Sequence, residues 1–147
     1  MLLALCVFVI SVRKMRELNE LSSKIIKAAI NVHNELGPGL FESVYHTCML
    51  IELENMRLSV QSEVPIPIIY QRRKVADEGF RLDLLVEDQI IVELKSVEKL
   101  QPIFQKQLLT YLRLANKQLG LLINFNEKLL KDGICRIINT PQNAWSA

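Results

Sequence analysis

The stretch DLLVEDQIIVELKS, residues 83–96, constrains the fold most, because it sets charged residues among leucine, isoleucine and valine. Two apolar runs separated by a short polar stretch predict two antiparallel strands joined by a tight turn. The turn centres near Asp88, and side chains alternate between the two faces of a strand. This register places Asp83 opposite or nearly opposite Glu93, with Lys95 on the same face. The sequence therefore predicts that two carboxylates and an ammonium group converge on one hairpin.

Such a cluster calls for a compensating positive charge. Two adjacent carboxylates repel each other, and removing them from water raises one pKa or costs free energy. A divalent cation relieves both effects, and Mg²⁺ prefers one or two carboxylates with water and phosphate oxygens as its other ligands. A neighbouring lysine would orient a water molecule or stabilise a developing anion. The alternative is a cross-strand cluster on a solvated sheet face, and the charges alone leave both possibilities open.

Changes in hydrophobic period divide the rest of the chain into elements. The predicted helices span residues 16–36, 40–57 and 101–116, and the predicted strands span residues 58–70, 80–86, 90–97, 119–125 and 134–139. Gly37-Pro38-Gly39 ends the first helix. Pro65 and Pro67 predict that the first strand lies at a sheet edge or carries a bulge, since proline cannot donate to a ladder. The polar segment QRRKVADEG, residues 71–79, is predicted to be a turn.

The order of these elements is helix, helix, strand, strand, strand, helix, strand, strand. Hairpin-linked strands followed by a crossover helix into a further strand predict a mixed sheet flanked by helices, which is an α/β fold. A chain of 147 residues is long enough for one domain with a real core.

Composition excludes several classes of protein. The net charge of +2 gives no global signature of a nucleic-acid coat or a membrane binder, so any site for a polyanion must be local. Cys6, Cys48 and Cys135 are odd in number and show no CxxC spacing, which indicates neither a disulfide framework nor a zinc site. These cysteines fit a reducing cytosol, and we expect a cytoplasmic protein.

The chain begins with the apolar segment MLLALCVFVISV. It is apolar for about ten positions, whereas a membrane-spanning helix needs about 20. Positive residues follow the apolar run, whereas a signal peptide carries them before it. We therefore expect residues 1–14 to be an apolar leader outside the fold, residues 15–140 to form a single domain, and residues 141–147 to be a tail, with no membrane partner.

Three residues outside the hairpin are further candidates for the site. Glu42 lies at the margin of the apolar face of the second helix, from which it can reach the hairpin, although an acid in a first helical turn is also favoured by the helix dipole. Gln107 and Tyr111 lie four apart on the last helix, on its inward side. The alternative for this pair is a core amide that has a hydrogen-bond partner, beside an amphipathic tyrosine.

Together these segments resemble one family. GLFESVY at residues 39–45 matches the GxxExxY motif of the GxxExxY proteins, a branch of the PD-(D/E)xK nuclease superfamily. The segments VHNELGPG, FRLDLLVEDQIIVELKSV, QLLTYL and LGLLINF also resemble that family, in the same order. The likeness runs from about Glu17 to Asn139.

The resemblance implies a restriction-endonuclease-like fold and a metal-dependent nuclease that acts on DNA with Mg²⁺ or Mn²⁺. By this resemblance Asp83 and Glu93 are metal ligands, and Glu42 is the helix glutamate that joins them as a ligand. Lys95 positions or activates the attacking water. Gln107 and Tyr111 match a QxxxY helix that is expected near the DNA phosphate.

Some features leave more than one interpretation. Arg81 is expected either to meet a phosphate or to pair with Glu93 or Glu63. Arg72, Arg73 and Lys74 depart from the short tyrosine-lysine-glycine turn expected in the family, and they form either a phosphate contact or a solvated turn.

More than one function is compatible with these residues. A catalytically silent module that binds nucleic acid or protein on the same fold is the alternative to the nuclease, and an RNA-directed nuclease would share the same site. His33 is expected to pack or to form a cap near the Gly37 turn. His46 is expected to have a structural role, since it lacks the partner spacing of a metal site.

Overall fold

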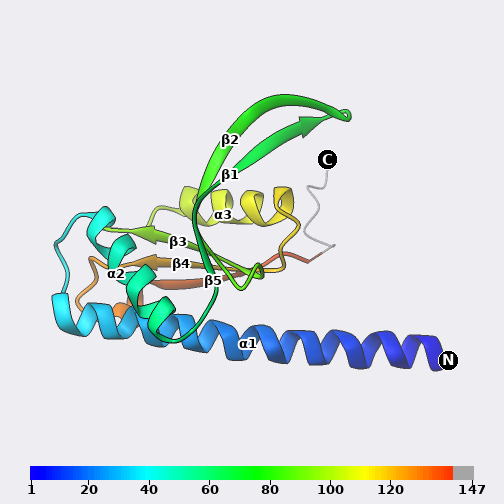
Figure 1. Cartoon of the computed structure of the whole chain (residues 1–147), viewed down its shortest axis with the longest axis horizontal. Helices are drawn as coiled ribbons and strands as arrows, with labels where there is room; N and C mark the ends of the chain where they lie inside the picture. Colours follow the sequence, from blue (N-terminus) through cyan, green and yellow to red (C-terminus); the bar gives the residue numbers. More distant parts are fainter. Residues whose placement is uncertain (141–147) are drawn as a thin grey trace.

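The structure is a computed structural model of the chain, and it describes residues 1–140 apart from the side chains of Val7, Phe8 and Ile10. The predicted tail, residues 141–147, lies outside the described residues. The elements are α1 (Leu2–Leu36), α2 (Glu42–Asn55), β1 (Val60–Tyr70), β2 (Arg73–Val86), β3 (Ile90–Lys95), α3 (Pro102–Leu114), β4 (Leu119–Asn124), the 3₁₀ helix η1 (Leu130–Gly133) and β5 (Ile134–Ile138) (Figure 1).

The five strands form one sheet in the order β1-β2-β3-β4-β5. Strands β3 and β4 run parallel, and every other pair of neighbours is antiparallel. Helix α3 makes the crossover between the two parallel strands, as such a connection requires. The mixed sheet flanked by helices and the predicted order of helices and strands are therefore confirmed.

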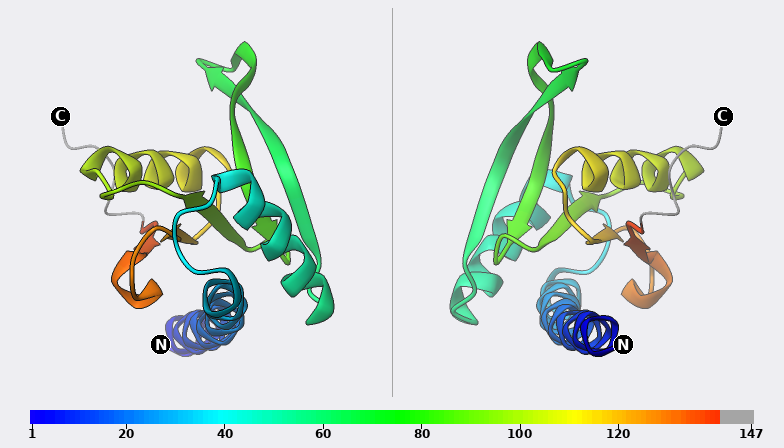
Figure 2. Two further views of the ribbon diagram at one scale, coloured as in Figure 1. Left: turned by 90° about the vertical axis from the view of Figure 1, so that its left-hand side faces the viewer. Right: turned by 90° about the vertical axis from the view of Figure 1, so that its right-hand side faces the viewer.

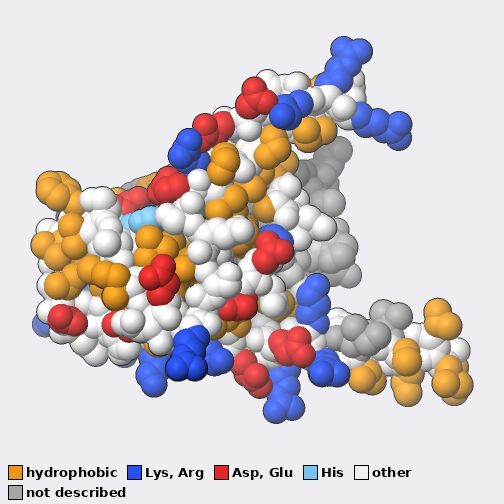
Figure 3. All heavy atoms as spheres, in the orientation of Figure 1, with side chains coloured by type: hydrophobic (Ala, Val, Ile, Leu, Met, Phe, Trp, Pro, Cys, Tyr) orange, Lys and Arg blue, Asp and Glu red, His pale blue; other side chains and the backbone are white. Residues whose placement is uncertain are grey.

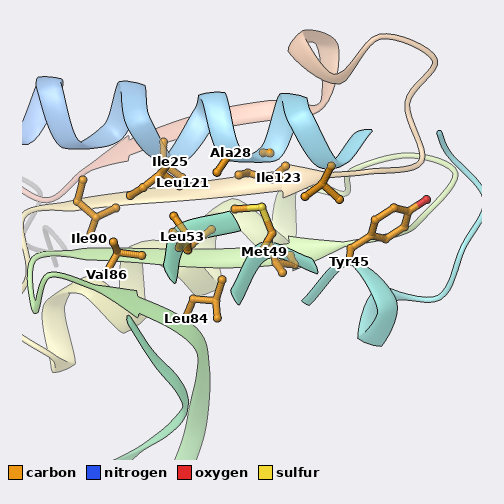
Figure 4. Close-up of a cluster of buried hydrophobic side chains, with 14 of the residues drawn as sticks. Ile25, Ala28, Tyr45, Met49, Leu53, Leu84, Val86, Ile90, Leu121 and Ile123 are labelled. Atoms are coloured by element: carbon orange, nitrogen blue, oxygen red, sulfur yellow. The ribbon is translucent and has the colours of Figure 1, made fainter. Parts of the chain in front are cut away.

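Helices cover both faces of the sheet (Figure 2). On one face α1 and α2 bury an apolar cluster that includes Ile25, Met49, Leu53 and Leu121 (Figure 4). On the other face α3 packs Leu108 and Leu112 against the sheet, together with residues such as Ile91 and Leu122. Strands β3 and β4 are buried on both faces, which explains why both sequences are mostly apolar, apart from Glu93 and Lys95 on β3 and Asn124 at the end of β4.

Strand β1 is an edge strand, and its register shifts between Ile66 and Ile68 and again before Ile69. The shifts lie beside Pro67, which has no N–H to donate to the ladder. Both parts of the prediction from Pro65 and Pro67 are confirmed, since β1 is at the edge and is also irregular.

The segment predicted as a polar turn is mostly strand. Strand β2 begins at Arg73, and only Gln71 and Arg72, with φ of 47° and 62°, form the connection. Two consecutive positive φ values are typical of the type I′ turn that matches strand twist. The prediction of a turn over residues 71–79 was wrong because this part of the hairpin extends beyond the sheet, with most of its side chains in water. Without a buried face, no alternation marks the strand.

Helix α1 begins at Leu2, whereas the periodicity predicted a start at residue 16. Its backbone hydrogen bonds are made within the helix, so this first part needs no tertiary contact to be helical. The described side chains among its first twelve residues are exposed, and they include Leu3, Leu5 and Val9. Among the described residues, no helix has the length and apolar character needed to cross a bilayer.

Candidate metal centre

Asp83 and Glu93 meet where the β2–β3 ladder ends. The register pairs Leu84 with Val92 and Leu85 with Ile91, so its next position sets Asp83 opposite Glu93. The Asp83 N–H donates to Oε1 of Glu93 at 3.3 Å, and the Leu94 N–H donates to Oδ2 of Asp83 at 2.8 Å. Each carboxylate thus accepts a hydrogen bond from the backbone of the opposite strand. The register predicted from the sequence is confirmed.

The hairpin formed by β1 and β2 bends at Asp83. Leu84 belongs to the cluster under α1 and α2, whereas Leu82, two residues away, belongs to the cluster under α3. Residues two apart on a regular strand share a face, so the strand twists between them. Glu63 lies opposite Asp83 on β1 and has a φ of 53°. This local twist places Asp83 where α2, α3 and the sheet meet.

Glu93 is the most buried acid of the site, with 7% of its surface exposed. The pKa of its carboxyl is raised from the ordinary value of 4.5 to about 8, chiefly by burial and also by the negative charge of Asp83 and a side-chain hydrogen bond with Asp83. The hydrogen bond from the Asp83 backbone and the charge of Lys95 oppose the rise in this pKa. Near neutral pH the pair therefore holds a proton when no other cation is bound.

Lys95 follows two residues after Glu93 at the end of β3 and is half-buried. Its Nζ lies 5.2 Å from the centre of the Phe104 ring on α3, a cation–π contact. The Lys95 charge lowers the pKa of both Glu93 and Glu42, so the ammonium group lies within electrostatic reach of the two acids. The expected convergence of Asp83, Glu93 and Lys95 is present.

Glu42 is the first residue of α2, and three hydrogen bonds fix the loop before it. Tyr45 is fully buried, and its hydroxyl donates to the carbonyl of Gly37 at 2.6 Å and accepts from the N–H of Leu40 at 3.1 Å. The Ser96 hydroxyl, next to Lys95, donates to the Leu40 carbonyl at 2.6 Å. The loop is therefore tied both to α2 and to the end of β3. In Figure 4 the Tyr45 hydroxyl points away from the apolar cluster.

The environment of Glu42 shows that it lies near the hairpin acids. Partial burial raises the pKa of its carboxyl, and the charge of Lys95 lowers it. Asp83 raises that pKa by like-charge repulsion, with smaller effects from His46 and Glu63. A cavity of about 190 Å³ opens between α2 and the hairpin, lined by Glu42, Ser43, His46, Glu63, Asp83 and Leu94.

Two residues that line this cavity, His46 and Glu63, were not among the site residues predicted from the sequence. His46 Nε2 lies 3.2 Å from the Asp83 carbonyl oxygen, 3.1 Å from Ser62 Oγ and 3.7 Å from Glu63 Oε1. The spacing of four residues from Glu42 puts His46 on the same side of α2, and this signal was available in the sequence. Glu63 is brought in only by the bend of the hairpin, which no sequence pattern indicates.

Tyr111 lies beside the hairpin. Its ring stacks on Phe80 of β2, with centroids 4.0 Å apart and an interplanar angle of 6°. Burial raises the pKa of the Tyr111 hydroxyl, and the charges of Glu93 and Asp83 raise it further, so the ring lies near both carboxylates. Gln107, one turn earlier, is exposed. The prediction that Gln107 faces inward was wrong, because its position on α3 lies just outside the strip that Leu108 and Leu112 bury.

Arg81 forms an ion pair with Glu78, three residues earlier on β2. Glu63 has only a small effect on the pKa of the guanidinium, after the dominant effect of Glu78. Neither of the two expected ion-pair partners, Glu93 and Glu63, is the acid that pairs with Arg81.

The acids of the site are oxygen donors of the kind that Mg²⁺ and Mn²⁺ prefer. Burial and the neighbouring charge of Asp83 raise the pKa of Glu93, and a divalent ion beside the two carboxylates would oppose both effects, so the chemistry of the pair fits such an ion. Among residues 1–140, no three histidine, cysteine, aspartate or glutamate side chains are arranged as a set that could hold a metal ion. The arrangement therefore offers a carboxylate pair, with Glu42 near it.

His33 has the structural role that the sequence predicts. It is buried in the last turn of α1, where its carbonyl accepts the Gly37 N–H at 2.8 Å and its Nε2 lies 2.7 Å from the Glu127 carbonyl oxygen.

Comparisons with known proteins agree with this geometry. The sequence model of the PD-(D/E)XK nuclease superfamily matches residues 19–137. Comparisons with curated proteins and with solved structures give no match. The five-stranded mixed sheet flanked by helices is consistent with the restriction-endonuclease-like fold. Because the match covers most of the described chain and includes the acidic hairpin, the protein belongs to the PD-(D/E)XK nuclease superfamily.

Proposed function

We propose that this protein is a metal-dependent nuclease of the GxxExxY branch that hydrolyses phosphodiester bonds in DNA. The observation that carries the proposal is the pair of interlocked carboxylates, Asp83 and Glu93, with Lys95 two residues further along the same strand. Membership of a nuclease superfamily supports the reaction class. The free cysteines Cys6, Cys48 and Cys135 support a cytoplasmic location.

The motif residues have structural reasons that support the GxxExxY assignment. Gly39 has a φ of 98°, a conformation that side chains other than glycine rarely adopt. Glu42 opens α2 and lies near Asp83 and Lys95. The Tyr45 hydroxyl ties the loop before α2 to this helix through Gly37 and Leu40, and its ring stacks on Phe125 with centroids 4.5 Å apart. The motif thus serves to present one glutamate to the hairpin acids.

Asp83 and Glu93 would hold a Mg²⁺ or Mn²⁺ ion, with Glu42 as a further carboxylate near the pair. When bound, the ion would supply Lewis-acid stabilisation of the negative charge that develops on the phosphate. The backbone hydrogen bonds to Asp83 and Glu93 fix both carboxylates before substrate arrives, which lowers the reorganisation needed. Burial of Glu93 keeps water from screening the charges.

Lys95 supplies the positive charge of the chain itself at this site. Its Nζ, which lies over the Phe104 ring, can donate hydrogen bonds to the attacking water or to a phosphate oxygen. Donation to water orients the nucleophile, and donation to phosphate stabilises the anion as the bond to the leaving oxygen breaks.

Nuclease assays on the full chain test this function. Wild-type protein is incubated with Mg²⁺ or Mn²⁺ and single- or double-stranded DNA or RNA, beside Asp83→Asn, Glu93→Gln and Lys95→Ala. Each variant is expected to lower the cleavage rate by ~100-fold or more, because each removes a charge that acts in the transition state. Glu98→Gln is the matched control, since Glu98 is an exposed acid just beyond β3.

Two results would contradict the proposal. One is the absence of metal-dependent cleavage of every substrate while the protein remains folded. The other is cleavage that the Asp83 and Glu93 variants retain. Binding without cleavage, and without carboxylate-dependent metal affinity, would support a silent binding module instead.

A further inference from the structure

Between Val64 and Leu82, the hairpin of β1 and β2 extends beyond the body of the protein, and we call this part the arm. Within the described residues its two strands pair only with each other, since β2 pairs with β3 only from Leu84 to Val86. Figures 1 and 2 show the arm leaving the sheet on the side of α3, away from α1. A projecting two-stranded ribbon of this length is not needed to cover the core.

The base of the arm is fixed to α3. Phe80 stacks on Tyr111, and Ile66 and Leu82 belong to the apolar cluster under α3. Farther out the side chains are exposed, including Ile69 at 54%, Tyr70 at 65% and Val75 at 59%. The arm is therefore a ribbon held at one end, with an apolar and aromatic surface open to a partner.

The tip of the arm carries uncompensated positive charge. Lys74 pairs with Asp77 at 2.9 Å, and Arg81 pairs with Glu78. Arg72 and Arg73 are exposed and form no ion pair with any described residue. Lysine and arginine side chains gather at this outer end in Figure 3. Local positive charge of this kind suits phosphate groups in an otherwise nearly neutral protein.

The turn itself is not optimised for folding. Gln71 and Arg72 both have positive φ, and such turns strongly prefer asparagine followed by glycine. A residue with a β-carbon in this conformation costs about 1 kcal/mol. Stability of the hairpin therefore gives no reason for an arginine at this position, whereas a phosphate contact does.

We propose that the arm binds duplex DNA, with its tip arginines on phosphates that lie within about one helical turn of the carboxylate site. Arg73 and Asp83 are ten positions apart on β2, so at ~3.3 Å per residue they lie at most about 33 Å apart along this curved strand. One turn of B-form DNA rises by roughly 34 to 36 Å. The position of the DNA over Asp83 and Glu93 rests on the proposed nuclease function.

The shape of the arm distinguishes duplex DNA from other nucleic acids. The major groove of B-form DNA admits a two-stranded ribbon. The major groove of A-form RNA is deep and narrow, so side chains cannot read it. Single strands offer no groove for a ribbon. The arm is therefore expected to contribute to the binding of double-stranded DNA and not of the other two.

Fluorescence anisotropy with the full chain in a metal chelator tests this proposal, because binding is then measured without cleavage. The probes are duplex DNA of about 30 base pairs, or roughly three helical turns, a duplex of about 8 base pairs, single-stranded DNA and duplex RNA. The variants are Arg72→Ala with Arg73→Ala, the single variant Arg72→Gly, and the control Lys24→Ala with Lys27→Ala. The control lysines are exposed on α1, which lies on the opposite side of the sheet from the arm.

The double arginine variant is expected to bind the long DNA duplex about tenfold or more weakly. The slope of its log affinity against log salt is expected to fall by about 2, one unit for each lost phosphate contact. The short duplex, the single strand and duplex RNA are expected to be bound equally by variant and wild type. Arg72→Gly is expected to keep or raise the melting temperature and still to weaken binding of the long duplex, which a structural role would not produce.

The proposal is overturned if the double arginine variant keeps the wild-type affinity and salt slope on the long duplex. It is also overturned if the lysine control loses as much affinity for the long duplex as the arginine variant does. The same holds if the arginine variant loses as much affinity for duplex RNA or single-stranded DNA as for the long duplex. If the arm contributes to DNA binding but no metal-dependent cleavage occurs, the nuclease function is contradicted and the DNA-binding role of the arm is supported. If cleavage occurs but the arm does not contribute to DNA binding, the nuclease function is supported and the role of the arm is contradicted.

Discussion

Asp83 and Glu93 each supply a hydrogen-bond acceptor to the strand of the other, at the point where the β2–β3 ladder ends. The arrangement brings two negative groups together inside the protein, one of them almost fully buried. Backbone donors alone do not balance that charge, because the pKa of Glu93 is still about 8. The pair is therefore held in place by the fold but is electrostatically incomplete.

The first prediction concerns pH and stability without metal. The pKa of Glu93 rises from 4.5 to about 8 on folding, so the folded protein binds this proton more tightly than the unfolded chain. Its contribution to stability is complete below pH 4.5 and is lost as pH rises through 8. The loss amounts to ~1.4 kcal/mol for each unit of difference in pKa. Chemical denaturation in a chelator at about pH 5 and about pH 9 is expected to show a larger loss for wild type than for Glu93→Gln. Equal losses in the two proteins would contradict the buried, protonated state of Glu93.

The second prediction concerns the loop before α2. Tyr45→Phe keeps the ring that stacks on Phe125 but leaves the Gly37 carbonyl and the Leu40 N–H without the partner that the hydroxyl provides. We expect a loss of about 1 to 3 kcal/mol in the free energy of unfolding. The cleavage rate at saturating substrate should also fall, because the loop positions Glu42.

A matched variant separates the two effects of Tyr45→Phe. Thr47→Ala removes a hydroxyl from the exposed side of the same helix, where it donates only to the Ser43 carbonyl. It should leave both the stability and the cleavage rate near those of wild type. A Tyr45→Phe protein with unchanged stability and rate would show that the loop is fixed by packing alone.

The third prediction concerns the stack that holds the base of the arm. Tyr111→Phe keeps the ring on Phe80, so thermal unfolding should be nearly unchanged. Tyr111→Ala removes the stack and is expected to cost about 1 to 3 kcal/mol. Binding of the long DNA duplex should weaken with it, since the arm loses its support. If Tyr111→Phe were as unstable as Tyr111→Ala, the hydroxyl and not the ring would be the important part.

The hairpin of β2 and β3 could be predicted from sequence in detail. Its turn is short and its strands are apolar, so the register follows from the position of Asp88 and the alternation of side chains. The predicted meeting of Asp83 with Glu93 therefore agrees with the structure to the residue. The order of elements follows in the same way from changes in hydrophobic period.

Other parts of the site could not be predicted because they depend on tertiary geometry. The bend of the hairpin brings Glu63 to the site, and a positive φ at a glutamate has no sequence signature. Gln107 lies at the border of the buried strip of α3, where helical periodicity cannot decide between inside and outside. The predicted start of β2 at residue 80 was too late, since the strand begins at Arg73. The outer half of the strand has no buried face, so its sequence shows no alternation of apolar and polar residues.

Asp83 and Glu93 are expected to form a divalent cation site, which calorimetric titration of the full chain with Mn²⁺ near neutral pH can test. The proteins compared are wild type, Asp83→Asn and the control Glu98→Gln. We expect Mn²⁺ binding to be unchanged in Glu98→Gln and ~100-fold weaker in folded Asp83→Asn, with a proton released as Glu93 ionises. Equal Mn²⁺ affinity in wild type and Asp83→Asn would show that the two carboxylates do not form a cation site.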